Sequence, residues 1–85
     1  MNDIEKRLIK CFQAVFPGMA EVQVLAATQE SVEAWDSLAT VTLVTVIDDE
    51  FRVELDVERL AEMTSYRSFY ECLTAAMPYG RNSSF

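Results

Sequence analysis

The sequence predicts a small domain built mainly from helices, and two observations carry that prediction. Apolar residues recur at helical spacing near both ends of the chain, over residues 4–16 and 66–77. The short strand-like segment at residues 21–25 has no second convincing strand beside it, and a lone strand cannot satisfy its backbone hydrogen bonds. The chain has 85 residues, 51% of them hydrophobic and 25% charged, which is typical of one small globular domain.

The first predicted helix covers residues 4–16. Its apolar residues form one stripe: Ile4, Leu8, Cys11, Phe12, Val15 and Phe16. Asn2, followed three residues later by Glu5, resembles a capping box at the start of this helix. Pro17 and Gly18 end it, because both residue types interrupt a helix.

A long connection is predicted over residues 17–35. We expect four of its apolar side chains to enter the core: Val22, Val24, Leu25 and Val32. A connection of this length inside a compact domain often has a functional reason. Trp35 ends it, and we expect its ring to pack the loop against the helices rather than to bind a partner directly.

The central segment, residues 37–51, has two interpretations on its residues alone. Seven β-branched side chains favour a strand: Thr40, Val41, Thr42, Val44, Thr45, Val46 and Ile47. Leu43, Ile47 and Phe51 keep a helical step of four residues. Leu43 and Thr45 also belong to a strand-like alternation, so helix and strand are about equally favoured.

A helical central segment would give Asp36 and Ser37 special positions. Asp36 is among the best residue types for capping a helix, because its carboxylate accepts from amides of the first turn. Ser37 would then lie at the positive end of the helix dipole, exposed, where an attached anion is stabilised.

Two further helices are predicted in the last third of the chain. Asp56 is a plausible cap for a short helix that ends near Glu62. Thr64 and Ser65 cap a last helix with a broad apolar face. That face consists of Tyr66, Phe69, Tyr70, Cys72, Leu73, Ala76 and Met77.

The end of the chain is expected to lie outside the domain. Pro78 and Gly80 stop the last helix, and residues 78–85 show no apolar periodicity. We therefore expect a domain over residues 1–77 and a flexible tail over residues 78–85.

Negative charge is concentrated in the middle of the chain, whose formal net charge is −7. Residues 36–62 hold eight acids (Asp36, Asp48, Asp49, Glu50, Glu54, Asp56, Glu58 and Glu62) against Arg52 and Arg59. Such a face repels phosphate backbones, so we expect no nucleic acid and a partner protein with a basic patch. The commoner role of such a face is only to keep a small domain soluble.

We expect a cytoplasmic protein without a membrane segment. Residues 1–8 mix charges and lack the apolar core of a signal peptide. The uncharged stretch over residues 37–47 is too short and too polar to span a bilayer. Cys11 and Cys72 match no metal or redox spacing, so buried reduced thiols are expected, with a disulfide as the lesser alternative.

The composition excludes most catalytic chemistry. The chain has no histidine, which removes Ser-His-Asp and Cys-His arrangements and any histidine metal site. Gly18 and Gly80 are its only glycines, so it has no glycine-rich phosphate loop. We therefore expect neither enzymatic activity nor a metal site. A serine that is only modified needs no base of its own, because the modifying enzyme can supply one.

The central segment resembles that of the acyl carrier proteins. The matching residues are Asp36-Ser37-Leu38, Val41, Leu43-Val44, Ile47 and Asp48-Asp49-Glu50-Phe51. Val53-Glu54-Leu55 and Met63-Thr64-Ser65 continue the family pattern in register. The resemblance covers roughly residues 3–75, and residues 4–16 resemble the first helix of the family.

The resemblance implies an all-α, four-helix bundle of acyl-carrier-protein type, with a long first loop and a short third helix. The central segment would be its second helix, stabilised by burial of Leu43, Val44, Ile47 and Phe51. Ser37 would carry 4′-phosphopantetheine derived from coenzyme A, whose thiol holds acyl groups as thioesters. The chain would shuttle them between enzymes of a fatty-acid, polyketide or other specialised biosynthetic pathway.

The resemblance also implies partners and contact residues. Asp36 would serve as helix cap and in recognition, and a partner interface would include Leu38, Val41, Thr45 and Asp48. The partners would be a phosphopantetheinyl transferase, an acyl-activating ligase, and an acyltransferase or synthase with a basic or apolar docking patch. A monomer is expected.

Three positions depart from the pattern of fatty-acid carriers. Ala39 and Thr42 stand where acids are usual, and Trp35 stands where glycine is usual. The start of the central helix is therefore more neutral, which favours partners that make apolar contacts there. The form resembles stand-alone carriers of specialised pathways, or peptidyl-type carriers. The alternative is an unmodified acidic helical interaction domain, in which Asp36 and Ser37 only cap a helix.

Overall fold

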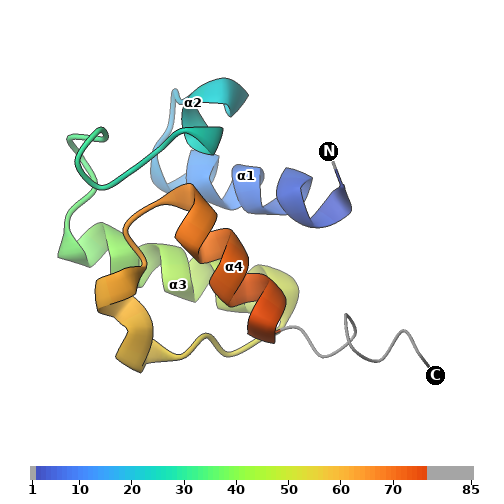
Figure 1. Cartoon of the computed structure of the whole chain (residues 1–85). Coiled ribbons are helices and arrows are strands. Elements are labelled where there is room, and N and C mark those ends of the chain that lie inside the picture. The colour runs from blue at the N-terminus through green and yellow to red at the C-terminus, as the bar shows by residue number, and fades with distance from the viewer. Residues whose placement is uncertain (1, 77–85) are drawn as a thin grey trace.

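The computed structural model describes residues 2–76, and helices are the only regular elements of that part (Figure 1). The elements are α1 (Asp3–Val15), α2 (Glu21–Leu25), α3 (Ser37–Phe51), the 3₁₀ helix η1 (Val57–Glu62) and α4 (Tyr66–Ala76). The predicted all-α class is therefore confirmed. α1 packs against α3 and α2, and α2 contacts α4. Within this part of the chain, no helix is long and apolar enough to cross a membrane.

Helix α1 begins and ends at the signals that the sequence contains. Asn2 Oδ1 accepts a hydrogen bond from the backbone N–H of Glu5 at 2.8 Å, and Glu5 Oε1 accepts one from the N–H of Asn2 at 3.4 Å. The predicted capping box is therefore present. Gly18 follows the helix with a φ of +95°, a backbone conformation that residues with a Cβ rarely adopt. Ile9 is also buried, a core position that the predicted stripe lacked.

The predicted loop contains a helix, and two of its expected core residues are not buried. Glu21–Leu25 forms α2, a short helix that buries Val24. Val22 is 72% exposed and Leu25 is 39% exposed, so the expectation for these two side chains was wrong. Successive residues of a helix point about 100° apart, so a single short helix can direct only part of its surface at the core. Val32 is partly buried against the core, as expected.

Helix α3 settles the choice between helix and strand in favour of helix. It buries Thr40, Leu43, Val44, Ile47 and Phe51 on its inner face. Its threonine hydroxyls are satisfied locally: Thr40 Oγ1 donates to the carbonyl of Asp36 at 3.3 Å, and Thr42 Oγ1 to that of Leu38 at 3.0 Å. Burial of the apolar face outweighs the weak propensity of β-branched residues for a helix.

The C-terminal end of α3 is tied to α1 by one arginine. Arg7 Nε lies 2.9 Å from Glu50 Oε2, and an Arg7 Nη donates to the Glu50 carbonyl at 2.8 Å. The same guanidinium lies 4.5 Å from the centre of the Phe51 ring. Arg52 then ends the helix in the left-handed region, with a φ of 55°.

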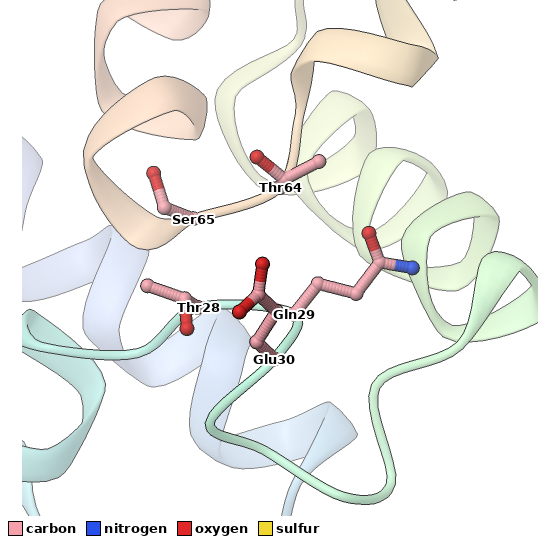
Figure 2. A pocket seen from close by; sticks show the side chains of 5 residues that line it. All are labelled: Thr28, Gln29, Glu30, Thr64 and Ser65. Atoms are coloured by element: carbon pink, nitrogen blue, oxygen red, sulfur yellow. The ribbon is translucent and has the colours of Figure 1, made fainter.

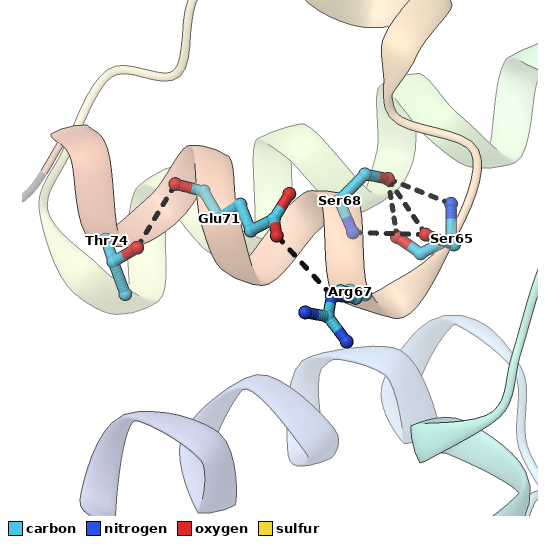
Figure 3. Close-up of polar contacts among 5 residues, drawn as sticks. All are labelled: Ser65, Arg67, Ser68, Glu71 and Thr74. Carbon is cyan, nitrogen blue, oxygen red and sulfur yellow. Dashed lines mark hydrogen bonds and ion pairs between the residues drawn. The ribbon is translucent and has the colours of Figure 1, made fainter.

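The long loop after α2 is tied to the start of α4. Thr28 and Ser65 form an isolated antiparallel bridge, and the N–H of Gln29 donates to the Thr64 carbonyl at 2.7 Å. Ser65 and Ser68 cap α4 reciprocally: each hydroxyl accepts from the backbone N–H of the other residue at 3.0 Å (Figure 3). The predicted cap at Ser65 is therefore confirmed.

The short helix predicted before Glu62 is present as η1. Asp56 caps η1, accepting from the N–H of Glu58 at 2.9 Å, so the predicted short helix is present in 3₁₀ form. The predicted Met77 position, the stop signals Pro78 and Gly80, and the predicted tail over residues 78–85 lie outside the described residues.

Candidate functional site

Ser37 is the first residue of α3 and is exposed. Figure 1 shows that α3 begins at an edge of the molecule, where the loop from α2 arrives. The Ser37 hydroxyl makes no hydrogen bond with any residue between 2 and 76. Its oxygen is thus available to a reagent from solvent, and no internal contact must break before it reacts.

Asp36 is the N-cap of α3, as the sequence predicts. Its Oδ1 accepts a hydrogen bond from the N–H of Ala39 at 2.9 Å. The first amides of a helix have no partner inside the helix, and those of Ser37 and Leu38 remain unbonded within the described part of the chain. Two free N–H groups and the positive end of the helix therefore lie beside the Ser37 hydroxyl. This arrangement favours an anionic group attached there.

The backbone around Ser37 is anchored to the core by Trp35. The Trp35 ring is buried among Phe12, Phe16 and Phe69, with ring centres 5.5–6.0 Å apart, which confirms its predicted packing role. Its Nε1–H donates to Thr40 Oγ1 at 2.8 Å. Because the Thr40 hydroxyl in turn donates to the Asp36 carbonyl, this network holds the residue before Ser37 in place.

A small hollow of about 220 Å³ adjoins Ser37. Its lining comes from three segments: Gln29 from the loop, Ser37, Thr40 and Val41 from α3, and Leu60 and Ala61 from η1. Gln29 also lines a second, more polar hollow of about 420 Å³, with Thr28, Glu30, Thr64 and Ser65. Figure 2 shows the side chains of Thr64 and Ser65 opposite those of Gln29 and Glu30 across this second hollow. Gln29 is therefore common to the hollow beside Ser37 and to the more polar one.

Three of the four predicted partner-contact residues are exposed on α3. Leu38 is 73% exposed, Val41 is 47% exposed and Thr45 is exposed. Asp48 is only half-buried, and its Oδ1 accepts from the N–H of Leu55 at 3.0 Å, which fixes the loop after α3. The structure thus gives Asp48 a role inside the chain that the sequence did not suggest, and leaves an apolar surface next to Ser37.

Several acidic residues of the middle third lie at the C-terminal end of α3 and in η1. Asp49 and Glu50 at the end of α3, and Glu58 and Glu62 in η1, are exposed. The first three turns of α3 carry no charged side chain. The surface near Ser37 therefore changes from apolar to acidic toward the end of the helix.

The thiols of the chain are not part of an exposed site. Cys11 and Cys72 are both buried and free. Burial raises the pKa of Cys11 to about 11, and burial also raises the pKa of Cys72. Both side chains therefore remain protonated and unreactive at neutral pH. Among residues 2–76, no cluster of carboxylate or thiol side chains could hold a metal ion.

Two residues of the site were missed by the sequence analysis. Thr40 supports the site through Trp35, but a threonine in a run of β-branched residues gives no separate signal. Gln29 reaches the site from a loop, and its position depends on the bridge between Thr28 and Ser65. Only the folded chain brings these side chains together.

Comparison with known proteins finds no relative of this chain. The chain matches no protein-family model, no curated protein and no solved structure. A function can therefore be argued only from the geometry around Ser37 and from the sequence motif that contains it.

Proposed function

We propose that this chain is an acyl carrier protein that holds acyl groups as thioesters on a 4′-phosphopantetheine arm attached to Ser37. The observation that carries the proposal is the exposed Ser37 hydroxyl, without an internal partner, at the start of a capped helix with two free amides. A phosphodiester at this position is stabilised by those amides and by the helix dipole. The helical arrangement is compatible with the four-helix fold of the acyl carriers, with α2 as an extra element in the first loop.

The size of the hollow beside Ser37 favours a tethered group over a free substrate. Ligand pockets usually enclose about 300–1,000 Å³, whereas this hollow has about 220 Å³ and is open to solvent. A covalently attached arm does not depend on enclosure, because the phosphodiester bond keeps it on the protein. The arm would supply the thiol that carries the acyl group, and this chain would supply the attachment point.

The buried cysteines support a carrier with one reactive thiol. The raised pKa values of Cys11 and Cys72 keep both side chains as thiols, and burial keeps acyl donors away from them. An acyl group delivered to this protein would therefore be held by the thiol of the arm alone.

The surface of α3 suggests how partner enzymes dock. A transferase, ligase or synthase would contact the apolar Leu38 and Val41 beside Ser37 and place basic residues against the acidic end of α3 and η1. Apolar contacts near the reacting group give affinity, while the acidic residues steer the encounter.

Thiol labelling of the native protein tests the proposal. Incubation with coenzyme A and a phosphopantetheinyl transferase is expected to add one thiol that reacts rapidly with a thiol-specific dye. The Ser37→Ala variant is expected to gain none, and Cys11 and Cys72 to stay unlabelled in both proteins. Rapid labelling before the transferase is added, or an equal gain in Ser37→Ala, would contradict the proposal.

A second experiment tests the docking surface. Val41→Asp is expected to lower kcat/KM of the transferase at least about tenfold, because it places a charge on the apolar contact beside Ser37. Val22→Asp is the matched control, since Val22 is also exposed and apolar but lies on α2. Equal losses for the two variants would exclude α3 as the docking surface.

A further inference from the structure

The hydroxyl of Thr40 links the core of the protein to the first turn of α3. It accepts a hydrogen bond from Trp35 Nε1–H at 2.8 Å and donates one to the Asp36 carbonyl at 3.3 Å. Thr40 is 6% exposed and Trp35 is 3% exposed, so little water competes for these bonds. The Thr40 hydroxyl is therefore bonded to both of the residues that directly precede Ser37.

The indole of Trp35 gives this link a fixed origin. Its ring lies against Phe12 and Phe16 of α1 and against Phe69 of α4, with ring centres 5.5–6.0 Å apart. A buried indole N–H usually finds a hydrogen-bond partner, and here that partner is a side chain of α3. Two other helices therefore hold the donor that bonds to Thr40.

The Asp36 carbonyl is the point at which this link acts on Ser37. The carbonyl accepts from the backbone N–H of Thr40 at 3.1 Å and also from the Thr40 hydroxyl. The carbonyl of Asp36 and the N–H of Ser37 belong to one planar peptide unit, so holding the carbonyl also sets the direction of the Ser37 N–H. The Asp36 carboxylate is fixed separately, by the N–H of Ala39 at 2.9 Å. Ser37 thus follows a residue that is held by its backbone and by its side chain.

The exposed threonines of α3 do not form such a link. The hydroxyls of Thr42 and Thr45 each donate to the carbonyl four residues earlier, at 3.0 Å. Neither hydroxyl accepts a hydrogen bond from the described part of the chain. A bond of that kind is the ordinary way in which a threonine satisfies its hydroxyl within a helix. Thr40 differs from them by its burial and by its indole donor.

We propose that Thr40, held by Trp35, is a positioning residue for attachment of the phosphopantetheine arm to Ser37, a role that rests on the proposed function. In that step the Ser37 oxygen forms a bond to the phosphorus of coenzyme A that carries pantetheine. The bond from this phosphorus to the bridging oxygen of the diphosphate breaks, adenosine bisphosphate leaves with the electron pair, and the transferase takes the serine proton. A serine whose backbone is already fixed loses less freedom in reaching this geometry.

This role predicts an effect on the rate of the step rather than on docking. Thr40 is buried and offers almost no surface to a docked enzyme, whereas Leu38 and Val41 are exposed beside Ser37. Removal of the Thr40 hydroxyl leaves those two contacts unchanged, so the KM for this protein should change little. It frees the peptide unit between Asp36 and Ser37, so kcat should fall.

NMR of the full chain tests the link itself. Trp35 is the only tryptophan, so its indole N–H gives a single resonance in ¹⁵N-labelled protein. Thr40→Val keeps the branched shape of the side chain, and it is expected to move this resonance upfield and to speed exchange of the Ala39 amide. Thr40→Ser keeps the hydroxyl and is expected to retain the wild-type pattern. An indole resonance and an amide exchange rate unchanged in Thr40→Val would overturn the proposal.

Kinetics with coenzyme A and a phosphopantetheinyl transferase test the role. Thr40→Val is expected to lower kcat on the order of tenfold and to keep KM within about twofold, and Thr40→Ser to recover most of the rate. Thr74→Val is the matched control, because the Thr74 hydroxyl donates to the Glu71 carbonyl within α4 at 3.1 Å. An unchanged kcat in Thr40→Val, a rise in KM alone, or an equal loss in Thr40→Ser or Thr74→Val would overturn the proposal.

Trp35→Phe tests the same link from its other end, and it decides the matter if Thr40→Val does not fold. This variant removes the indole donor and keeps an aromatic ring in the core. It is expected to lower kcat without changing KM, and the double variant is expected to lose no more than Thr40→Val alone, because both changes break one hydrogen bond. An unchanged kcat in Trp35→Phe, or losses that multiply in the double variant, would overturn the proposal.

Modification of the wild type separates this proposal from the proposed function. Wild type that gains no arm would refute the proposed function and this role with it. Wild type that gains the arm no faster than folded Thr40→Val would refute the positioning role alone and leave the carrier function standing.

Discussion

At the start of α3, the residues that stabilise the backbone differ from the residue whose hydroxyl is exposed for reaction. Asp36 supplies the cap and Trp35 anchors the chain, whereas Ser37 contributes no side-chain hydrogen bond to residues 2–76. The hydroxyl can therefore be replaced or modified without loss of a stabilising contact. This division is the residue-scale reason why Ser37 suits a modification site.

Two substitutions at neighbouring positions test this division. Asp36→Ala is expected to lower the free energy of unfolding by about 1 kcal/mol, because it removes the bond to the Ala39 amide. Ser37→Ala is expected to change it by less than about 0.5 kcal/mol. Chemical denaturation monitored by circular dichroism measures both. A loss in Ser37→Ala as large as that in Asp36→Ala would show that the serine hydroxyl has a structural role.

Removal of the Tyr66 hydroxyl is not expected to destabilise the protein, whereas removal of a hydrogen-bonded buried tyrosine hydroxyl usually does. Tyr66→Phe should leave the free energy of unfolding unchanged or raise it by up to about 1 kcal/mol, because the hydroxyl has no partner among the described residues. Denaturant unfolding of the two proteins provides the measurement. A clear loss of stability would mean that the hydroxyl is hydrogen-bonded in the free protein.

At the scale of elements, predictability depended on whether the signal is local. The start of α1 could be predicted, because Asn2 and Glu5 are close in sequence and form the capping box directly. The state of α3 could not be derived from its propensities, because its helix is stabilised by burial against α1. Helix α2 was missed because five residues are too few to show helical periodicity.

Burial of α3 predicts unequal effects for its two leucines. Leu43→Ala is expected to cost about 2–5 kcal/mol, since Leu43 is fully buried and its loss leaves a cavity. Leu38→Ala is expected to cost less than about 0.5 kcal/mol, because Leu38 is 73% exposed. Urea unfolding of both variants measures the difference. Similar losses would place α3 in a different rotation about its axis.

At the scale of the whole molecule, the site depends on contacts between distant segments. The hollow beside Ser37 needs the loop that carries Gln29, the start of α3 and η1 to meet. The sequence contains each segment but not their distances, which follow from the bridge at Thr28 and the packing of Trp35. For this reason the motif around Ser37 could be predicted from the sequence, and the surrounding hollows could not.

Stability is expected to fall as the pH rises from about 9 to about 12. The ordinary pKa values of Cys11 and Tyr66 are 9.0 and 10.0, and in the folded chain they are raised to about 11 and about 12. In this interval the unfolded chain holds fewer protons than the folded one, so rising pH favours unfolding. Denaturation midpoints across this range measure the effect.

The Tyr66→Phe variant is the control for this pH dependence. Its stability is expected to fall less steeply than that of the wild type between about pH 10 and about pH 12, because one of the two groups is absent. Identical slopes for the two proteins would show that the burial of Tyr66 does not govern its titration.

The central proposal concerns one covalent bond at Ser37, and the mass of the intact protein reports that bond most directly. Wild type and Ser37→Ala would be incubated in parallel with coenzyme A and a broad-specificity phosphopantetheinyl transferase. The proposal predicts that the wild type gains the mass of one phosphopantetheine group and that the variant gains none. No gain in well-folded wild type, repeated with a transferase from the same source, would contradict it and leave an unmodified acidic interaction domain as the account of this chain.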